Sequence, residues 1–197
     1  MKRLFMTAGM VFLAMLPGKG QDLSLCVTPT FNDLFLHRGL DGGSIVHLKA
    51  GVSSSFQCDF IGERRVYTGA GLCYQFGQLE ISPSPDPTVS HDTRVEIAHL
   101  LTVNLRLALK LGKDYHLSAD PLLDFQLNQG EPDATENQTG LGLSFGCGKK
   151  ILLGDYLFLM IEPRLWIHNL VPFSGEVSPA RLATGGLNLG LGARLNN

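Results

Sequence analysis

Apolar and polar residues alternate one by one along segment 94–111. One series is apolar: Val95, Ile97, Leu101, Val103, Leu105, Leu107, Leu109 and Leu111; the other holds Arg94, Glu96, Thr102, Asn104, Arg106 and Lys110. Because successive side chains leave a strand on opposite faces, this period of two predicts a β-strand. Strands of soluble proteins usually have about five or six residues, whereas a tilted membrane strand needs about nine to eleven. The length therefore favours a strand that crosses a membrane.

The same alternation recurs through the chain and predicts eight strands, at 22–31, 45–60, 66–76, 94–111, 115–127, 140–150, 156–168 and 186–196. Their connections alternate in length. Short ones fall near 62–65, 112–114 and 153–155, and long polar ones at 32–44, 79–91, 128–139 and 169–184. Short periplasmic turns and longer extracellular loops are typical of outer-membrane barrels. The predicted fold is all-β, an eight-stranded antiparallel up-and-down transmembrane β-barrel with a filled polar lumen and periplasmic termini.

The polar faces of these strands carry charges of both signs. We interpret them as a structural salt-bridge network in the lumen, formed by Lys49, Arg94, Glu96, Arg106, Lys110, Asp120, Asp124, Glu162, Arg164 and Arg194. Buried charges persist when they are paired, and an eight-stranded barrel is just wide enough for side chains. A proton or ion relay through Glu96, Arg106, Glu162 and Arg164 is the alternative. If the charges form a structural salt-bridge network, the lumen is filled and no open pore is expected.

The start of the chain has the anatomy of a signal peptide: a basic Met1-Lys2-Arg3, a short apolar stretch, and small residues before Gln21. We therefore expect 1–20 to be cleaved and 21–197 to form the single barrel domain.

The formal net charge of −2 gives no reason to expect nucleic-acid binding. The six histidines lack metal-ligand spacing and the four cysteines form no C-x-x-C motif. No metal and no cofactor are expected, and the cysteines are interpreted as unpaired apolar fillers.

Several short motifs resemble small outer-membrane barrels, the PorT-like proteins and the OmpA/OmpX-type barrels. The resemblance is carried by Val95-Glu96-Ile97 with Leu100-Leu101, Gly140-Leu141-Gly142-Leu143 with Gly146, Ile161-Glu162-Pro163-Arg164, and Leu189-Gly190-Leu191-Gly192. Ala98 stands where that family commonly has proline, and the chain ends in Leu195-Asn196-Asn197 rather than an aromatic residue. The resemblance implies a bacterial outer-membrane location, and its PorT-like members imply a role in an export or transport assembly.

The function expected from these patterns is non-enzymatic: a structural or surface-interaction role for a monomer surrounded by outer-membrane lipid. A protein partner would bind the extracellular loops, with Phe35, Leu36, His37 and Arg38 as the best candidate contact surface because loops on a rigid scaffold carry function. An outer-membrane lipid-modifying enzyme is an alternative raised by the outward His99, although Leu101 stands where a nucleophilic serine is needed. A soluble lipocalin-like ligand-binding barrel is a further alternative, which would require the apolar faces to point inward.

Overall fold

The computed structural model describes residues 20–35, 45–61, 65–82, 93–173 and 181–195. They form eight strands: β1 (Gln21–Phe35), β2 (Ile45–Phe60), β3 (Val66–Ser82), β4 (Arg94–Lys110), β5 (Tyr115–Gln126), β6 (Gly140–Leu152), β7 (Leu157–Pro172) and β8 (Arg181–Leu195). No described segment is a helix long and apolar enough to span a membrane.

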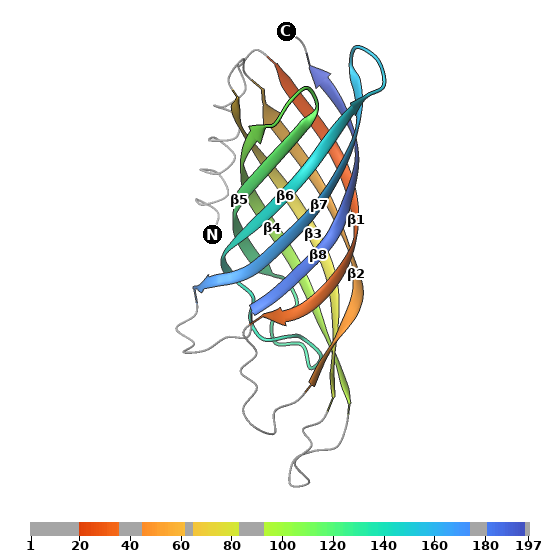
Figure 1. The fold of residues 1–197 in the computed structure, drawn as a ribbon. Coiled ribbons are helices and arrows are strands. Elements are labelled where there is room, and N and C mark those ends of the chain that lie inside the picture. The colour runs from red at the N-terminus through yellow and green to blue at the C-terminus, as the bar shows by residue number, and fades with distance from the viewer. Residues whose placement is uncertain (1–19, 36–44, 62–64, 83–92, 174–180, 196–197) are drawn as a thin grey trace.

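Each strand pairs with its sequence neighbours in antiparallel register, and β1 also pairs with β8, which closes the barrel (Figure 1). Gln21 lies opposite Leu195 in that closing pair. Closure gives every strand two partners, so no edge is left with unpaired backbone groups. The predicted fold class, an eight-stranded antiparallel up-and-down transmembrane barrel, is confirmed.

One end of the barrel carries tight turns. Gly112 and Gly154 lie in the turns after β4 and β6, each with φ 149°, a backbone conformation that favours glycine. The antiparallel order puts the β8 end at the same end as the β4 and β6 ends, and the β1 start lies there too because Gln21 pairs with Leu195. We call it the short-turn end, and the opposite end, where β3 leads toward β4 and β5 toward β6, the long-loop end.

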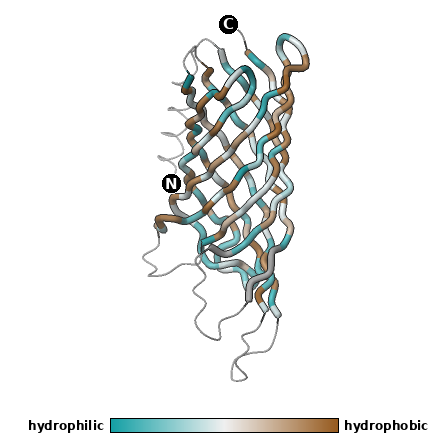
Figure 2. Tube along the Cα trace, viewed as in Figure 1, coloured by the Kyte–Doolittle hydropathy of each residue, from teal (hydrophilic) through white to brown (hydrophobic). Residues whose placement is uncertain are grey.

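Hydrophilic and hydrophobic residues alternate along the strands (Figure 2), and along most of each strand the apolar series is the exposed one. On β4, Leu105 and Leu107 are more than half exposed, whereas their sequence neighbours Asn104 and Arg106 are buried. Exposed apolar side chains of this kind occur on all eight strands, including Leu25, Phe31, Val52, Leu72, Val103, Leu117, Leu141, Leu165, Leu189 and Leu191. A continuous apolar outer surface around a polar interior is the arrangement of a lipid-facing barrel. It excludes the lipocalin-like alternative, whose apolar faces would point inward.

On β3 this arrangement reverses toward the long-loop end. On β3 the outward series runs from Tyr74 and Phe76 to Gln78, Glu80 and Ser82. The inward side chains change from polar to apolar. Four buried side chains pack together across the interior: Leu79, Ala98, Leu100 and Leu182. We call these four residues the apolar layer. On β3 the strand thus continues beyond the lipid-facing surface with polar side chains outside and Leu79 inside.

The connection between β5 and β6 packs onto this section. The Ile97 N–H on β4 donates to Asp133 O at 2.7 Å, and the Thr135 N–H donates to Ile97 O at 3.1 Å. Gln138 is fully buried, and its side-chain oxygen accepts a hydrogen bond from the Leu182 N–H at 2.9 Å. Because Leu182 belongs to the apolar layer, this loop is anchored directly over the interior.

Several expected boundaries were wrong at the long-loop end. Strands predicted to stop at 31, 76 and 168 continue to Phe35, Ser82 and Pro172, and β8 begins at Arg181 rather than 186. Two irregularities also interrupt the alternation: the β2–β3 register shifts between Leu48 and Val52, and the β6–β7 register shifts between Leu141 and Leu143. The expected signal peptide, 1–20, lies outside the described residues except for Gly20.

Candidate functional site

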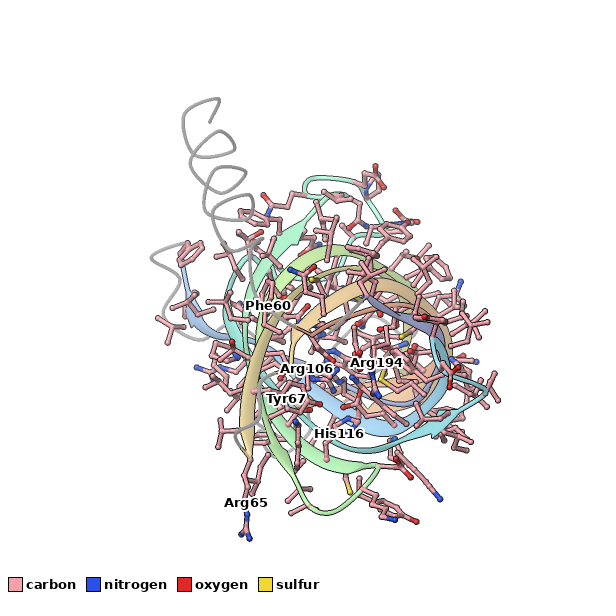
Figure 3. All side chains as sticks on the ribbon, turned by 90° about the horizontal axis from the view of Figure 1, so that it is seen from above. Phe60, Arg65, Tyr67, Arg106, His116 and Arg194 are labelled. Atoms are coloured by element: carbon pink, nitrogen blue, oxygen red, sulfur yellow. The ribbon has the colours of Figure 1, made fainter. Side chains whose placement is uncertain are left out.

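The inward series of the strands brings charged side chains together in the lumen (Figure 3). Nearest the short-turn end, Lys150 Nζ lies 2.9 Å from Asp22 Oδ2 and 2.9 Å from Asp59 Oδ2. Arg194 Nε lies 3.1 Å from the other oxygen of Asp22. The Lys150 ammonium also lies 4.9 Å from the Phe158 ring centroid. One lysine therefore bridges two carboxylates that come from neighbouring strands β1 and β2.

Glu162 on β7 is the centre of the network. Its carboxylate forms an ion pair with Arg106 and lies 3.3 Å from an Arg164 nitrogen. It also accepts hydrogen bonds from Ser118 at 3.0 Å and Asn188 at 3.2 Å. The Glu162 and Arg106 side chains are 0% and 1% exposed, so neither has bulk water to stabilise its charge. A buried carboxylate is tolerated under these conditions only because its lone pairs are occupied by cations and hydroxyl or amide donors.

Two further carboxylates lie on β5 toward the long-loop end. Asp120 Oδ2 lies 2.6 Å from Arg164 Nη2. Asp124 accepts a hydrogen bond from the Thr102 hydroxyl at 2.6 Å, and its other oxygen lies 3.1 Å from His168 Nδ1. The inner network thus holds five carboxylates (Asp22, Asp59, Asp120, Asp124 and Glu162) and four arginine or lysine cations (Arg106, Lys150, Arg164 and Arg194).

Glycines on the facing strands make room for these side chains. A Cβ atom on Gly146 would collide with a Glu162 carboxylate oxygen, and one on Gly148 would lie 2.6 Å from the His116 ring. A lumen cavity lined by Cys26, Gln57, Asn104, Arg106 and Trp166, among others, measures about 10 Å³. That volume is about the space required by one water molecule. The side chains therefore fill this part of the lumen.

His116 and Ser118, two residues apart on the inward face of β5, do not have the geometry of a catalytic pair. Ser118 Oγ and His116 Nε2 both approach the same Glu162 oxygen, at 3.0 and 3.3 Å. In a hydrolase the serine donates to the histidine, which a carboxylate then orients. Here the carboxylate occupies the position that the histidine would need, so the serine is not activated.

His99 lies on the outward face, as expected, but its partner is an aromatic hydroxyl. Tyr74 Oη is 2.7 Å from His99 Nδ1, and the Phe76 ring centroid is 5.3 Å from the histidine ring. We call Tyr74, Phe76 and His99 the Tyr74 cluster. It lies where the outward series of β3 changes from apolar to polar. Amphipathic rings gather at the headgroup level of membranes, so the cluster marks one boundary of the lipid-facing surface.

The structure places the expected network residues in three different parts of the barrel. Arg106, Asp120, Asp124, Glu162, Arg164 and Arg194 lie in the lumen network. Lys110 lies at the short-turn end, with its ammonium 6.0 Å from the Tyr67 ring centroid. The assignment of Lys49, Arg94 and Glu96 to this network was wrong. Arg94 pairs with Glu96 at 2.8 Å and Lys49 pairs with Glu80, all at the long-loop end.

Lys49, Arg94 and Glu96 were misplaced because alternation gives the face of a strand but not the level along the barrel. Lys49 also falls within the register shift of β2. Sequence reasoning missed Lys150, although the series Gly146, Gly148, Lys150 on the small-residue face of β6 contained the signal. The candidate contact surface is only partly described. Phe35 is the last residue of β1, while Leu36, His37 and Arg38 lie outside the described residues.

All four cysteines are unpaired, and only Cys147 is exposed. Among the described residues, no three or more histidine, cysteine, aspartate or glutamate side chains are grouped to hold a metal ion.

Solved structures of other proteins share the barrel architecture of this chain. No protein-family model matches the chain, and no curated protein matches it either. Among solved structures, Neisserial surface protein A (NspA) has a TM-score of 0.57 at 12% identity, covering 88% of this chain and 96% of that one. Outer membrane protein AlkL has a TM-score of 0.54 at 10% identity, with 91% and 92% covered. OprG from Pseudomonas aeruginosa has a TM-score of 0.50 at 11% identity, with 91% and 98% covered.

These similarities define the class of protein by its fold. The chain has the architecture of eight-stranded outer-membrane β-barrel proteins over nearly its whole length. At 10–12% identity the likeness concerns the fold alone. The PorT-like assignment suggested by the sequence stays a prediction.

Proposed function

We propose that this protein is a monomeric bacterial outer-membrane barrel without an open pore and without enzymatic activity. In this proposal the barrel is a structural anchor, and other molecules contact it at the long-loop end, which faces the cell exterior. The observation that carries the proposal is the double obstruction of the lumen. Charged and polar side chains fill its membrane section, and the apolar layer with the anchored loop 127–139 covers the section beyond.

The apolar layer argues against solute passage on physical grounds. Leu79, Leu100 and Leu182 are fully buried, so a hydrated solute would have to displace packed leucines and then break paired charges. Removing one partner of a buried ion pair typically costs about 3–5 kcal/mol. A closed lumen leaves the surface as the part of the molecule available for contacts. The described surface at this end includes the exposed residues Arg94, Glu131 and Asp133.

Planar-bilayer conductance of the refolded full-length protein tests the absence of a pore. We expect no discrete conductance steps, with a trimeric porin in the same bilayer as the positive control. Heat-modifiable gel mobility of the same preparation establishes that the barrel is folded. Reproducible steps from the folded protein would overturn the proposal, as would a folded protein that stays in solution without detergent.

The orientation has its own test in intact cells. Glu131 is exposed in the loop after β5, and Lys113 is exposed in the short turn after β4. A membrane-impermeant maleimide added to intact cells should label Glu131→Cys but not Lys113→Cys, and both should be labelled after lysis. Wild-type protein, whose exposed Cys147 lies on the lipid-facing surface, gives the background. The reverse labelling pattern would overturn the orientation.

A further inference from the structure

The outward surface of β4 to β7 is hollowed near the short-turn end. A groove of about 750 Å³ crosses these strands, and its lining is almost entirely apolar. Leu109, Leu117 and Cys147 lie side by side in one row of its lining, and Leu107, Ala119 and Phe145 in the next. The groove forms because the small side chains of Ala119 and Cys147 stand between larger ones. We call it the β4–β7 groove.

The groove opens toward the membrane boundary on the short-turn side. Leu109 is the last residue but one of β4, and Leu117 is the third residue of β5. Tyr115, which is 52% exposed, directly precedes Leu117 on the same outward face. Exposed tyrosines mark the headgroup level of a membrane. The groove therefore begins beneath the headgroup region on the short-turn side and extends toward the middle of the barrel, where Leu165 and Gly186 line it.

Basic side chains surround this end of the groove. Lys149 lies opposite Tyr115 in the β5–β6 register, and its ammonium is 5.0 Å from the Tyr115 ring centroid. Lys113 is exposed in the turn between β4 and β5, and Arg65 directly precedes Val66, which lines the groove. Figure 3 shows Arg65 pointing away from the barrel. Among the described residues, none of these three cations forms an ion pair.

Acidic side chains on the same rim are fewer. Asp114 lies in the turn between β4 and β5, and Asp155 lies in the next turn, after β6. Of the described charged residues around the groove opening, basic ones therefore predominate. The groove thus presents an apolar surface with a mostly basic rim at its short-turn end.

We propose that the β4–β7 groove and its basic rim bind an anionic phospholipid of the periplasmic leaflet. Lys149, Lys113 and Arg65 contact the phosphate region, Tyr115 lies at the headgroup level, and an acyl chain occupies the groove. A phospholipid has this same distribution of charge and apolar length, with an anionic phosphate at one end of its acyl chains. The inference rests on the proposed function for the periplasmic orientation of the short-turn end.

Native mass spectrometry of the full-length folded barrel released from detergent tests the site. The probes are palmitoyl-oleoyl phosphatidylglycerol and palmitoyl-oleoyl phosphatidylcholine, which share acyl chains and differ in net charge. We expect preferential retention of one phosphatidylglycerol. Replacing Lys149, Lys113 and Arg65 by glutamine should weaken that binding about fivefold for each charge removed, since a basic residue near an anionic surface contributes about 1 kcal/mol. Arg94→Gln, the same change at the long-loop end, should leave retention unchanged.

The groove itself is tested by filling it. Ala119→Leu should reduce phosphatidylglycerol retention, whereas Ala193→Leu, a matched change on the outward face of β8 outside the groove, should not. Equal retention of the two lipids, equal effects of Lys149→Gln and Arg94→Gln, or a dimer whose contact is lost in Ala119→Leu would each overturn the proposal. A folded barrel with any of these results refutes the lipid site alone. A protein that fails to fold in lipid refutes the proposed function instead.

Discussion

The two sections of this barrel on either side of the Tyr74 cluster have different interiors, although a small buried cluster of Cys26, Phe158 and Met160 also lies in the short-turn section. On the short-turn side the interior holds Arg106, Glu162 and their partners, and the outside is leucine. On the long-loop side the interior is the apolar layer, and β3 turns Gln78 and Glu80 outward. The strands run without interruption through both sections. The apolar face of a strand is therefore not constant along its length. It depends on whether lipid or water surrounds the barrel at each level.

The transition between the two sections is itself polar and well bonded. Gln75 Nε2 donates to Thr184 Oγ1 at 2.7 Å, and the Thr184 hydroxyl donates to Asn32 Oδ1 at 3.1 Å. These neutral side chains separate the ion pairs from the leucines. Each section can therefore be perturbed by its own kind of substitution.

The largest expected effect lies in the polar section. Glu162→Gln keeps the side-chain size but leaves Arg106 and Arg164 without their shared carboxylate. We expect the free energy of unfolding to fall by about 3–5 kcal/mol, as when one partner of a buried ion pair is removed. Urea unfolding of the barrel in phosphocholine vesicles measures this free energy of unfolding. Glu131→Gln, on an exposed loop residue, is the control, and equal effects of the two changes would contradict the central role of Glu162.

The apolar layer should respond as a packed protein core. Leu100→Ala opens a cavity in the interior and should lower the free energy of unfolding by about 2–5 kcal/mol. Leu105→Ala on the same strand faces lipid, where acyl chains fill the vacated space, so its cost should be smaller. The same urea titration compares them. A larger loss for Leu105→Ala would mean that the apolar layer is not a packed core.

Charge insertion on the outward face of β4 should locate the boundary between the sections. Leu105 is 55% exposed and Val95 is 47% exposed, so exposure alone predicts the same response. Leu105→Arg should cost about 2–4 kcal/mol because the side chain faces the lipid interior, whereas Val95→Arg beyond the Tyr74 cluster should cost about 0–1 kcal/mol. Folding yield and unfolding free energy in vesicles measure both. Equal costs would place the boundary elsewhere.

The smallest expected effect concerns the ion pairs at the long-loop end. Lys49 and Glu80 are 42% and 28% exposed, so water screens their attraction. The double-mutant cycle of Lys49→Gln and Glu80→Gln should give a coupling below about 1 kcal/mol that decreases further at high salt. A coupling as large as the Glu162 effect would show that this end is less hydrated than its side chains suggest.

Alternation in the sequence was sufficient to predict the strand number, the lipid-facing series and most lumen residues. It failed where the polarity reverses. In segment 66–76 the outward residues are mostly apolar, as the prediction required. β3 nevertheless continues to Ser82, and in this continuation the outward residues are polar. The expected ends at 31 and 76 therefore lie close to the membrane boundary rather than at the ends of the strands.

The remaining errors come from information that a single strand does not contain. Glu96 and Arg106 share a face of β4, yet ten residues along a strand place them at opposite levels, so only Arg106 reaches Glu162. The partner of each lumen charge depends on the registers of β5, β7 and β8. Asn169 on β7 has a φ of 52°, and the alternation ends early at this irregularity. The sequence around Asn169 did not predict it.

The spacing between Tyr115 and the Tyr74 cluster determines which bilayers suit this barrel. The lipid-facing stretch of this part of the chain runs from Leu101 on β4 to Leu111, the residue after β4, which is ten residue steps. At about 3.4 Å per residue and a tilt near 40°, that stretch rises about 26 Å along the barrel axis. The average hydrocarbon core is about 30 Å thick, and the bacterial outer membrane is thinner than average. Hydrophobic thickness alone would therefore favour this protein's residence in a thin membrane, since a thicker one would have to compress around it.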